Sequence, residues 1–544
     1  MGGLQKTTVI DLTAYVAGPA CARIMGDLGA EVIKVEPFGG DEMRTQGMAW
    51  GMKFRTEFDD VAMDCTSFNK RWVSINLKTE DGHAFMMKML EKADILLTSY
   101  RDKALEHLGL DYETLHEKFP RLVFGQMRGY GEYGPMKDAK GFDATSFAAR
   151  SGFVHAIPQA NEHFEPGNSP IAFGDWNASN ALAVGVLAAY ANALKTGEGD
   201  KVTTSLYHVG TWGMTAALVA QQQGCDYPKD RMMAKCPTNN SYVSADGIWF
   251  LMCFGHYNRY CKLVFETLEM DSKYWSDPEY NNLETLAQNG NYVEVTAAIH
   301  KACMKWPYAE LEKRFRENDI PFEKIQSVKD VLCDEEAFAN DQLRRVKYDD
   351  GQGYGEDSSY TITTTPYRLK SIGDPVLRRS KPIGYDTKEV ALEYGYSAQD
   401  VERMVSEGAV LVYDGKPVPD AVLEPSYRLL TYREPSYMYY ALQGCFSEWG
   451  FKPIESFEDE ISALSVIGSN EDAVAIMLDS IRDVVWDSLK LIPIKEFDKP
   501  YHWIGFMYRK NYKYNSEIVS FIERMKEVCS TVAYVEPIER RYYF

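Results

Sequence analysis

The sequence lacks the patterns that usually mark metal sites, disulfide frameworks and membrane proteins. Its ten cysteines are scattered without a CxxC pair, and none of its nine histidines belongs to an HExxH motif. Because this cysteine usage is typical of a reducing compartment, we expect a cytoplasmic protein with no metal site and no disulfides. The longest apolar run, residues 181–194, is too short and too rich in alanine to span a bilayer, so we expect no membrane partner.

Positive charge is also scarce. The formal net charge is −20, from 59 Lys and Arg residues against 79 Asp and Glu residues. This balance argues against a nucleic-acid partner, because an acidic protein surface repels the phosphate backbone. An anionic ligand would need a local cluster of basic side chains.

The elements that are present alternate between strand and helix. Short apolar runs predict strands at residues 9–12, 31–35, 73–77, 95–98 and 122–126, with helical patterns between them. A longer alanine-rich helix is expected at 176–194, followed by a strand at 201–206. Strands separated by helices predict an α/β fold with a parallel, Rossmann-like sheet.

A glycine-rich segment, GYGEYG at residues 129–134, matches the GxGxxG pattern of dinucleotide-binding loops. Pro135 follows it, and residues 136–141 do not have the helical pattern that such a loop requires. We therefore interpret the segment as a turn after a strand. The GxSxG motif of hydrolases is also missing from the sequence.

One carboxylate, Asp175, stands among small and apolar residues in the stretch SPIAFGDWNAS, just before the long helix. Asp is a favourable N-cap residue, so Asp175 has a plain structural interpretation. A carboxylate is also a nucleophile that is ionised at neutral pH when its pKa is near 3.9. Taken by themselves, the residues indicate only an α/β enzyme that binds a small molecule.

An ordered series of motifs resembles the family III CoA-transferases (the CaiB/BaiF type). The series spans about residues 4–410 and comprises AGP at 17–19, DLGAEVIKVE at 27–36, NKR at 69–71, SINLK at 74–78, GYG at 129–131, GP at 134–135, FD at 142–143, GD at 174–175 and TG at 196–197 through SL at 205–206. Each motif is weak alone, but the set in this order and spacing is specific.

The resemblance implies an interlocked homodimer with a Rossmann-like CoA-binding domain at 1–210, a smaller α+β domain at 211–330 and a return segment at 331–424. It also implies that coenzyme A is a co-substrate and that Asp175 is the nucleophile. The residues that the resemblance places at the CoA site are Val16, Ala17, Lys78, His107, Lys140 and Phe142. His107 stands where a related formyl-CoA transferase has an arginine, so its phosphate contact departs from the family pattern.

The resemblance also narrows the set of possible reactions and substrates. Related α-methylacyl-CoA racemases have a histidine base directly before the Asp, whereas Phe142 stands there in this sequence and cannot take a proton. The stretches FDATSFAARSG at 142–152 and IPFEKIQS at 320–327 resemble the members that act on 2-hydroxy acids of amino-acid fermentation and their enoates. A racemase-like enzyme and a bile-acid CoA-transferase remain the alternatives.

The family pattern ends near residue 410, and a further segment follows. YREP at 432–435, GFKP at 450–453, IGS at 467–469, LIPI at 491–494 and the run at 508–525 resemble the end of a LysR-type effector-binding domain, in an extra α/β segment at 425–544. We expect this extension to be an appendage of the enzyme. The contrasting hypothesis is a regulatory protein that senses a ligand without catalysis.

Overall fold

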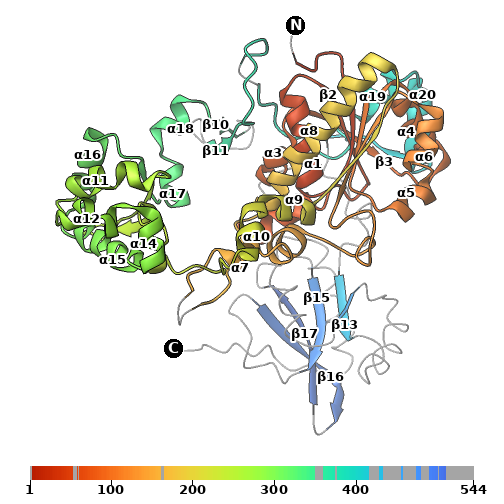
Figure 1. The fold of residues 1–544 in the computed structure, drawn as a ribbon. Helices are drawn as coiled ribbons and strands as arrows, with labels where there is room; N and C mark the ends of the chain where they lie inside the picture. The colour runs from red at the N-terminus through yellow and green to blue at the C-terminus, as the bar shows by residue number, and fades with distance from the viewer. Residues whose placement is uncertain are drawn as a thin grey trace.

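The computed structural model describes residues 3–52, 58, 60–160, 164–348, 359–373 and 376–415, together with strands between residues 428 and 509. Figure 1 shows a large α/β body, a smaller helical body and a separate C-terminal sheet. Within the described residues, no helix combines the length and apolar character needed to cross a bilayer.

The large body is built on a seven-stranded sheet in the order β12-β3-β2-β1-β4-β5-β6. Its parallel strands are β1 (Thr8–Leu12), β2 (Glu31–Glu36), β3 (Lys70–Ile75), β4 (Ile95–Thr98), β5 (Val123–Arg128) and β6 (Lys201–Ser205). The short β12 (Val410–Leu411) returns from much later in the chain and pairs antiparallel with β3. The predicted α/β fold with a parallel sheet is confirmed.

Helices cover both faces of this sheet. On one face, α1 (Ala17–Asp27) and α8 (Phe173–Thr196) pack side by side and share a core of small apolar residues with the sheet. A second core lies against the other face and includes residues from α4 (Glu80–Lys92), α5 (Asp102–Leu108), α6 (Tyr112–Lys118), α19 (Thr387–Glu393) and α20 (Ala398–Ser406). Small residues on α1 and α8 let the two helices approach closely, which brings both of their N-termini to one region.

Shorter helices complete the large body. They are α2 (Met43–Ala49), α3 (Val61–Ser67), the π-helix η1 (Asp143–Ala149), α7 (Phe153–Ala156), α9 (Leu206–Gly213) and α10 (Thr215–Gln222). The sequence pattern did not predict these elements, because most of them are only one or two turns long.

The smaller body has its own apolar core around an antiparallel sheet of β7 (Asn239–Val243), β8 (Trp249–Cys253) and β9 (Phe322–Lys324). Its helices are α11 (Tyr257–Thr267), α12 (Lys273–Ser276), α13 (Pro278–Asn281), α14 (Leu283–Asn289), α15 (Tyr292–Cys303) and α16 (Tyr308–Glu317). The segments beside it are η2 (Arg231–Met233), α17 (Val328–Val331), α18 (Glu335–Ala339) and the hairpin of β10 (Leu343–Lys347) and β11 (Ser359–Thr363).

The C-terminal sheet has the order β14-β13-β15-β17-β16. Its strands are β13 (Arg428–Tyr432), β14 (Glu455–Phe457), β15 (Ala473–Leu478), β16 (Leu489–Lys499) and β17 (His502–Arg509). Of the residues resembling a LysR-type domain, 491–494 fall in β16. Residues 433–435, 450–453, 467–469 and 510–525 lie outside the described residues.

Two helix starts differ from the sequence-based expectation. The sequence pattern predicts a turn at residues 17–19 and a helix from residue 20, but α1 begins at Ala17 and residues 17–19 form its first turn. Pro19 is compatible with that position, because the first N–H groups of a helix have no partner inside it. The long helix likewise begins at Phe173 rather than at residue 176, so Asp175 lies inside its first turn.

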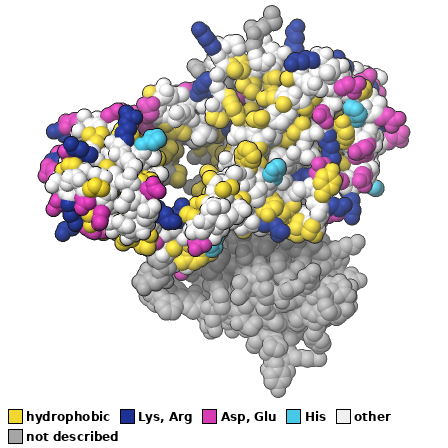
Figure 2. All heavy atoms as spheres, in the orientation of Figure 1, with side chains coloured by type: hydrophobic (Ala, Val, Ile, Leu, Met, Phe, Trp, Pro, Cys, Tyr) yellow, Lys and Arg dark blue, Asp and Glu magenta, His cyan; other side chains and the backbone are white. Residues whose placement is uncertain are grey.

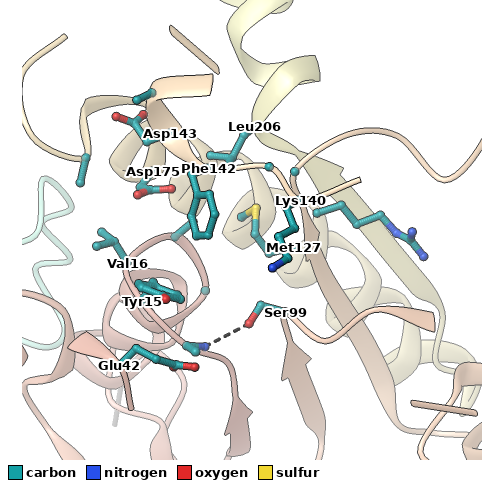
Figure 3. A pocket seen from close by; sticks show the side chains of 18 of the residues that line it. Tyr15, Val16, Glu42, Ser99, Met127, Lys140, Phe142, Asp143, Asp175 and Leu206 are labelled. Atoms are coloured by element: carbon teal, nitrogen blue, oxygen red, sulfur yellow. Dashed lines mark hydrogen bonds between the residues drawn. The ribbon is translucent and has the colours of Figure 1, made fainter. Parts of the chain in front are cut away.

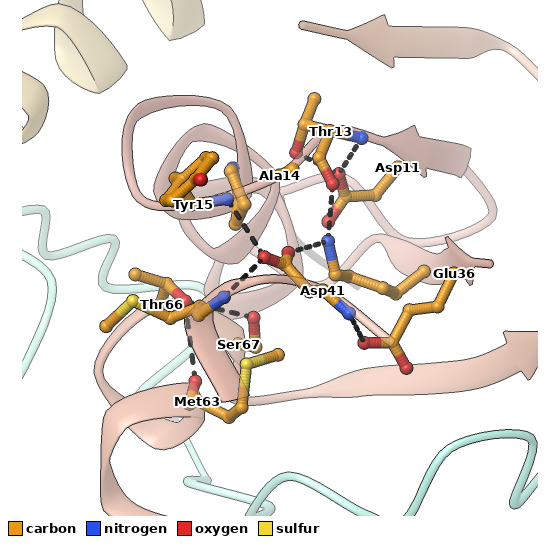
Figure 4. Close-up of polar contacts among 12 residues, drawn as sticks. Asp11, Thr13, Ala14, Tyr15, Glu36, Asp41, Met63, Thr66 and Ser67 are labelled. Carbon is orange, nitrogen blue, oxygen red and sulfur yellow. Dashed lines mark hydrogen bonds and ion pairs between the residues drawn. The ribbon is translucent and has the colours of Figure 1, made fainter. Parts of the chain in front are cut away.

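A set of buried charges lies beneath the loop that follows β1 (Figure 4). Lys70 pairs with Asp11 at 2.8 Å, and Lys34 pairs with Asp41 at 2.7 Å and donates to the Thr13 carbonyl at 2.6 Å. Burial opposes ionisation of Asp11, but Lys34 and Lys70 outweigh it and hold the pKa of Asp11 below its ordinary value. These pairs connect β1, β2 and β3 to the loop at residues 13–16.

We expect Lys70→Met to lower the free energy of unfolding by about 3 kcal/mol, because it leaves the buried Asp11 carboxylate without its ion-pair partner. The control is Arg71→Met on the same strand, whose pairs with the more exposed Glu31 and Glu393 contribute less than about 1 kcal/mol. Urea denaturation of both variants measures the difference. Equal losses would contradict this account of the buried charges.

Candidate active site

A cavity of about 800 Å³ opens where loops follow the carboxyl ends of β1, β4 and β5. This edge of a parallel α/β sheet is the usual place for a ligand, because the strand ends and helix N-termini meet there. Segments at 14–18, 99–101, 127–129, 137–144 and 168–175 form its walls. Figure 3 shows Asp175, Asp143 and Phe142 in this cavity, with Tyr15 and Val16 nearby.

Asp175 lies in the first turn of α8 and its side chain does not cap the helix. The N-cap residue is Ala172, in the left-handed conformation with φ of 55°, and no side chain caps the helix there. The N-cap interpretation of Asp175 is therefore wrong. Its carboxylate receives no hydrogen bond from the described residues, so it remains available to a ligand in the cavity.

The surroundings of Asp175 disfavour its ionised form. Burial, and secondly the negative charge of Asp143, raise the pKa of Asp175 to about 7. The pKa near 3.9 expected from the sequence is therefore wrong for Asp175, because its surroundings in the folded chain raise it. At neutral pH a substantial part of the population still carries the charge that a nucleophile needs.

Asp143 fixes the start of α8. Its Oδ1 accepts a hydrogen bond from the Gly174 backbone N–H at 2.7 Å, and the Ser169 hydroxyl donates to Oδ2 at 3.4 Å. A Cβ atom on Gly174 would lie 2.3 Å from Asp143 Oδ1 and 2.2 Å from Phe147 Cγ. Glycine is required before Asp175 because the loop carboxylate and an aromatic ring occupy that space.

Asp143 is one site residue that sequence reasoning missed. It follows Phe142 directly and precedes Asp175 by more than thirty residues, so local spacing does not connect the two carboxylates. The signal available in the sequence was the FD motif at 142–143 of the family resemblance, which includes Asp143 but does not give its role.

The first glycine of the glycine-rich segment packs against Gly141, which lies beyond the segment. A Cβ atom on Gly129 would lie 2.6 Å from the Gly141 Cα, and one on Gly141 would lie 2.7 Å from the Gly129 Cα. The two glycines bring the strand end and the start of η1 together, which positions Phe142 and Asp143 over the cavity. Residues 129–142 contain no helix, which agrees with the interpretation of the segment as a turn.

The predicted CoA-site residues fall into two groups. Val16, Ala17, Lys140 and Phe142 line the cavity together with Asp175, whereas Lys78 and His107 are exposed and do not line it. Arg101 and Lys137 also line the cavity and were not predicted. These two cations and Lys140 give it a basic part despite the acidic net charge, while Arg128 is paired with Asp102.

Comparisons with known proteins agree with this architecture. The family model described as CoA-transferase family III matches residues 4–387. The chain is 37% identical over 407 residues to cinnamoyl-CoA:phenyllactate CoA-transferase of Clostridium sporogenes, covering 74% of this chain and 96% of that protein. It is 34% identical over 403 residues to (R)-2-hydroxy-4-methylpentanoate CoA-transferase of Clostridioides difficile, covering 73% of this chain and 97% of that protein.

Solved structures share the fold at lower identity. A CAIB/BAIF family protein from Brucella suis matches with a TM-score of 0.59 and 22% identity, over 72% of this chain and 100% of that one. A hypothetical protein from Mycobacterium tuberculosis matches with a TM-score of 0.60 and 23% identity, over 72% and 99% of the two chains. The whole C-terminal extension at 425–544 lies beyond the family match.

We expect Gly174→Ala to lower the free energy of unfolding by roughly 1–3 kcal/mol, because the new methyl group overlaps Asp143 and Phe147. Gly167→Ala is the matched control, since a Cβ atom there meets nothing within 4 Å. Urea denaturation compares the two variants. A Gly174→Ala protein as stable as the Gly167→Ala protein would contradict the packing described here.

Proposed function

Since the chain belongs to CoA-transferase family III, we propose that it exchanges CoA between a 2-hydroxy acid and the corresponding enoyl thioester, with Asp175 as the nucleophile. The observation that carries the proposal is the position of Asp175. Its carboxylate lies in the first turn of α8, accepts no hydrogen bond from the described residues and lines a cavity with a basic part. The relatives from Clostridium sporogenes and Clostridioides difficile, whose names specify 2-hydroxy acids, support the substrate class.

In the proposed first half-reaction, the Asp175 carboxylate attacks the thioester carbonyl of an acyl-CoA. The C–S bond breaks, a mixed anhydride forms on Asp175, and CoA leaves as a thiolate. The thiolate then attacks the aspartyl carbonyl of the anhydride. This step forms an aspartyl-CoA thioester and releases the first acid as its carboxylate.

The second half-reaction reverses these steps with another acid. Its carboxylate attacks the aspartyl thioester, releases the CoA thiolate and forms a new mixed anhydride. Attack of the thiolate on the acyl carbonyl gives the product acyl-CoA and restores the Asp175 carboxylate. Every step exchanges one activated acyl bond for another, so no external energy source is required.

The chain offers electrostatic support for these steps. The N-terminus of α8 favours negative charge in its first turn, typically by about 0.3–1 kcal/mol. Arg101, Lys137 and Lys140 are proposed to hold the CoA phosphates, with Val16, Ala17 and Phe142 along the cofactor. Lys78 and His107 would contact only a part of CoA that extends beyond the cavity.

The alternatives have less support from this site. A racemase needs a second proton-transfer group, and the phenyl ring of Phe142 cannot supply one. A bile-acid CoA-transferase would use the same nucleophile and differ only in the acid. A purely ligand-sensing protein would not need a half-buried carboxylate such as Asp175, which has no hydrogen-bond partner among the described residues.

We further propose a cytoplasmic homodimer and the division into domains at 1–210, 211–330, 331–424 and 425–544. Apolar side chains lie exposed on the large body in the view of Figure 2. On α8, Val184 is 65% and Leu194 is 60% exposed. A second copy covering such a helix would remove these side chains from water.

We expect Asp175→Asn to lower CoA exchange by at least about 10³-fold, because an amide is a far weaker nucleophile than a carboxylate. The assay follows transfer from cinnamoyl-CoA to phenyllactate and from 4-methylpentenoyl-CoA to 2-hydroxy-4-methylpentanoate by chromatography. Adding Asn177→Asp to this variant places a carboxylate two positions later in α8. We do not expect this double variant to regain CoA exchange. Exchange by Asp175→Asn at the rate of the unmodified protein would overturn the proposed mechanism.

The raised pKa of Asp175 predicts a pH dependence. A carboxylate with pKa about 7 loses its charge as pH falls, so kcat/KM should drop about tenfold per pH unit below that value. Asp143→Asn removes the nearby negative charge, which lowers the pKa of Asp175 and moves this limb of the profile to lower pH.

The control for this profile is Asp138→Asn, at an exposed carboxylate on the same loop. Steady-state rates between pH 5 and pH 9 measure all three proteins. An acid limb that stays in place in Asp143→Asn would show that Asp143 does not act on Asp175 through its charge.

A further inference from the structure

Tyr15 has a backbone conformation that is unusual for an aromatic residue. Its φ is +65°, in the left-handed region, which costs a residue with a Cβ atom roughly 1–2 kcal/mol. The Tyr15 N–H donates to Asp41 Oδ1 at 3.0 Å, and Asp41 is in turn fixed by Lys34 at 2.7 Å. Buried groups therefore hold the residue in a strained conformation, a pattern that is concentrated at functional sites.

This conformation places the Tyr15 ring at the cavity. The ring meets Phe142 edge to face, with 5.7 Å between the ring centroids, and both residues line the same cavity as Asp175. The neighbouring Val16 packs in one apolar cluster with Ala172, the N-cap residue of α8. The Tyr15 loop is thus in contact with the segment that presents the nucleophile (Figure 3).

The Tyr15 hydroxyl is available to a ligand. No described residue forms a hydrogen bond with it, and the ring is only half-buried. Burial, and then the carboxylates of Glu42 and Asp41, raise the pKa of the Tyr15 phenol above its ordinary value, so the hydroxyl keeps its proton. A neutral phenol can both donate and accept a hydrogen bond.

The negative charges near Tyr15 restrict which substrate groups can bind at its hydroxyl. Glu42 lines the cavity beside it, and Asp41 lies beneath its backbone. A second carboxylate on the substrate would be repelled at this place, whereas a neutral hydroxyl would not. When an acid is joined to Asp175 through its carboxyl carbon, its 2-position is only one bond away from the reacting centre.

We propose that the Tyr15 hydroxyl binds the 2-hydroxyl group of the acid substrate and makes Tyr15 a specificity-determining residue, an inference that rests on the proposed function. Phe142 then covers the adjoining apolar part of the acyl chain, and Glu42 disfavours acids that carry a second carboxylate. The hydrogen bond distinguishes the 2-hydroxy acid from the enoate, which has no group at that position to receive it.

The test is Tyr15→Phe, which removes only the oxygen. With phenyllactate as acceptor, kcat/KM should fall about 5- to 10-fold, the effect of one hydrogen bond. With 3-phenylpropanoate, which lacks the 2-hydroxyl, it should change by less than about twofold. The matched control is Tyr133→Phe, because Tyr133 is 87% exposed and does not line the cavity.

The outcomes are distinguishable. If the unmodified protein transfers CoA to neither phenyllactate nor cinnamate, the proposed function fails and this inference fails with it. If the unmodified protein uses phenyllactate but Tyr15→Phe changes both acids by the same factor, only the role of Tyr15 is overturned. A selective loss for phenyllactate supports both.

Discussion

The hydrogen bond from the Gly174 N–H to Asp143 is the contact on which the site depends. It joins the loop after β5 to the first turn of α8, two segments that the sequence keeps far apart. The same carboxylate that fixes the helix start also places a negative charge beside Asp175. Asp143 therefore helps to position the proposed nucleophile and, after burial, is the second cause of its raised pKa. The absence of a side chain at Gly174 permits this contact.

Buried ion pairs beneath the loop after β1 are a second constraint on the site. The buried pairs of Lys34 with Asp41 and of Lys70 with Asp11 hold the loop after β1, including the strained backbone of Tyr15. Ala172, which packs in one apolar cluster with Val16 and also lines the cavity, is likewise in the left-handed conformation. Strain at two residues that line one cavity is stable only because the surrounding sheet and helices are tightly packed.

Much of this arrangement could be predicted from the sequence. Alternating apolar runs located the strands of the parallel sheet to within a few residues, and the family resemblance singled out Asp175. The role of Asp143 could not be predicted, because it depends on a contact across more than thirty residues that only the folded chain makes. The raised pKa of Asp175 was hidden for the same reason, since burial is a property of the whole packing. Lys78 and His107 were carried over from the resemblance, and the cavity does not include them.

The central claim is that Asp175 becomes covalently activated by an acyl-CoA. The most direct measurement is to incubate the protein with cinnamoyl-CoA, trap it with hydroxylamine and map the modified peptide by mass spectrometry. The account predicts an aspartyl hydroxamate at Asp175 that is absent when the acyl-CoA is omitted. Full CoA exchange without modification at this residue, or with modification at a different carboxylate, would contradict it.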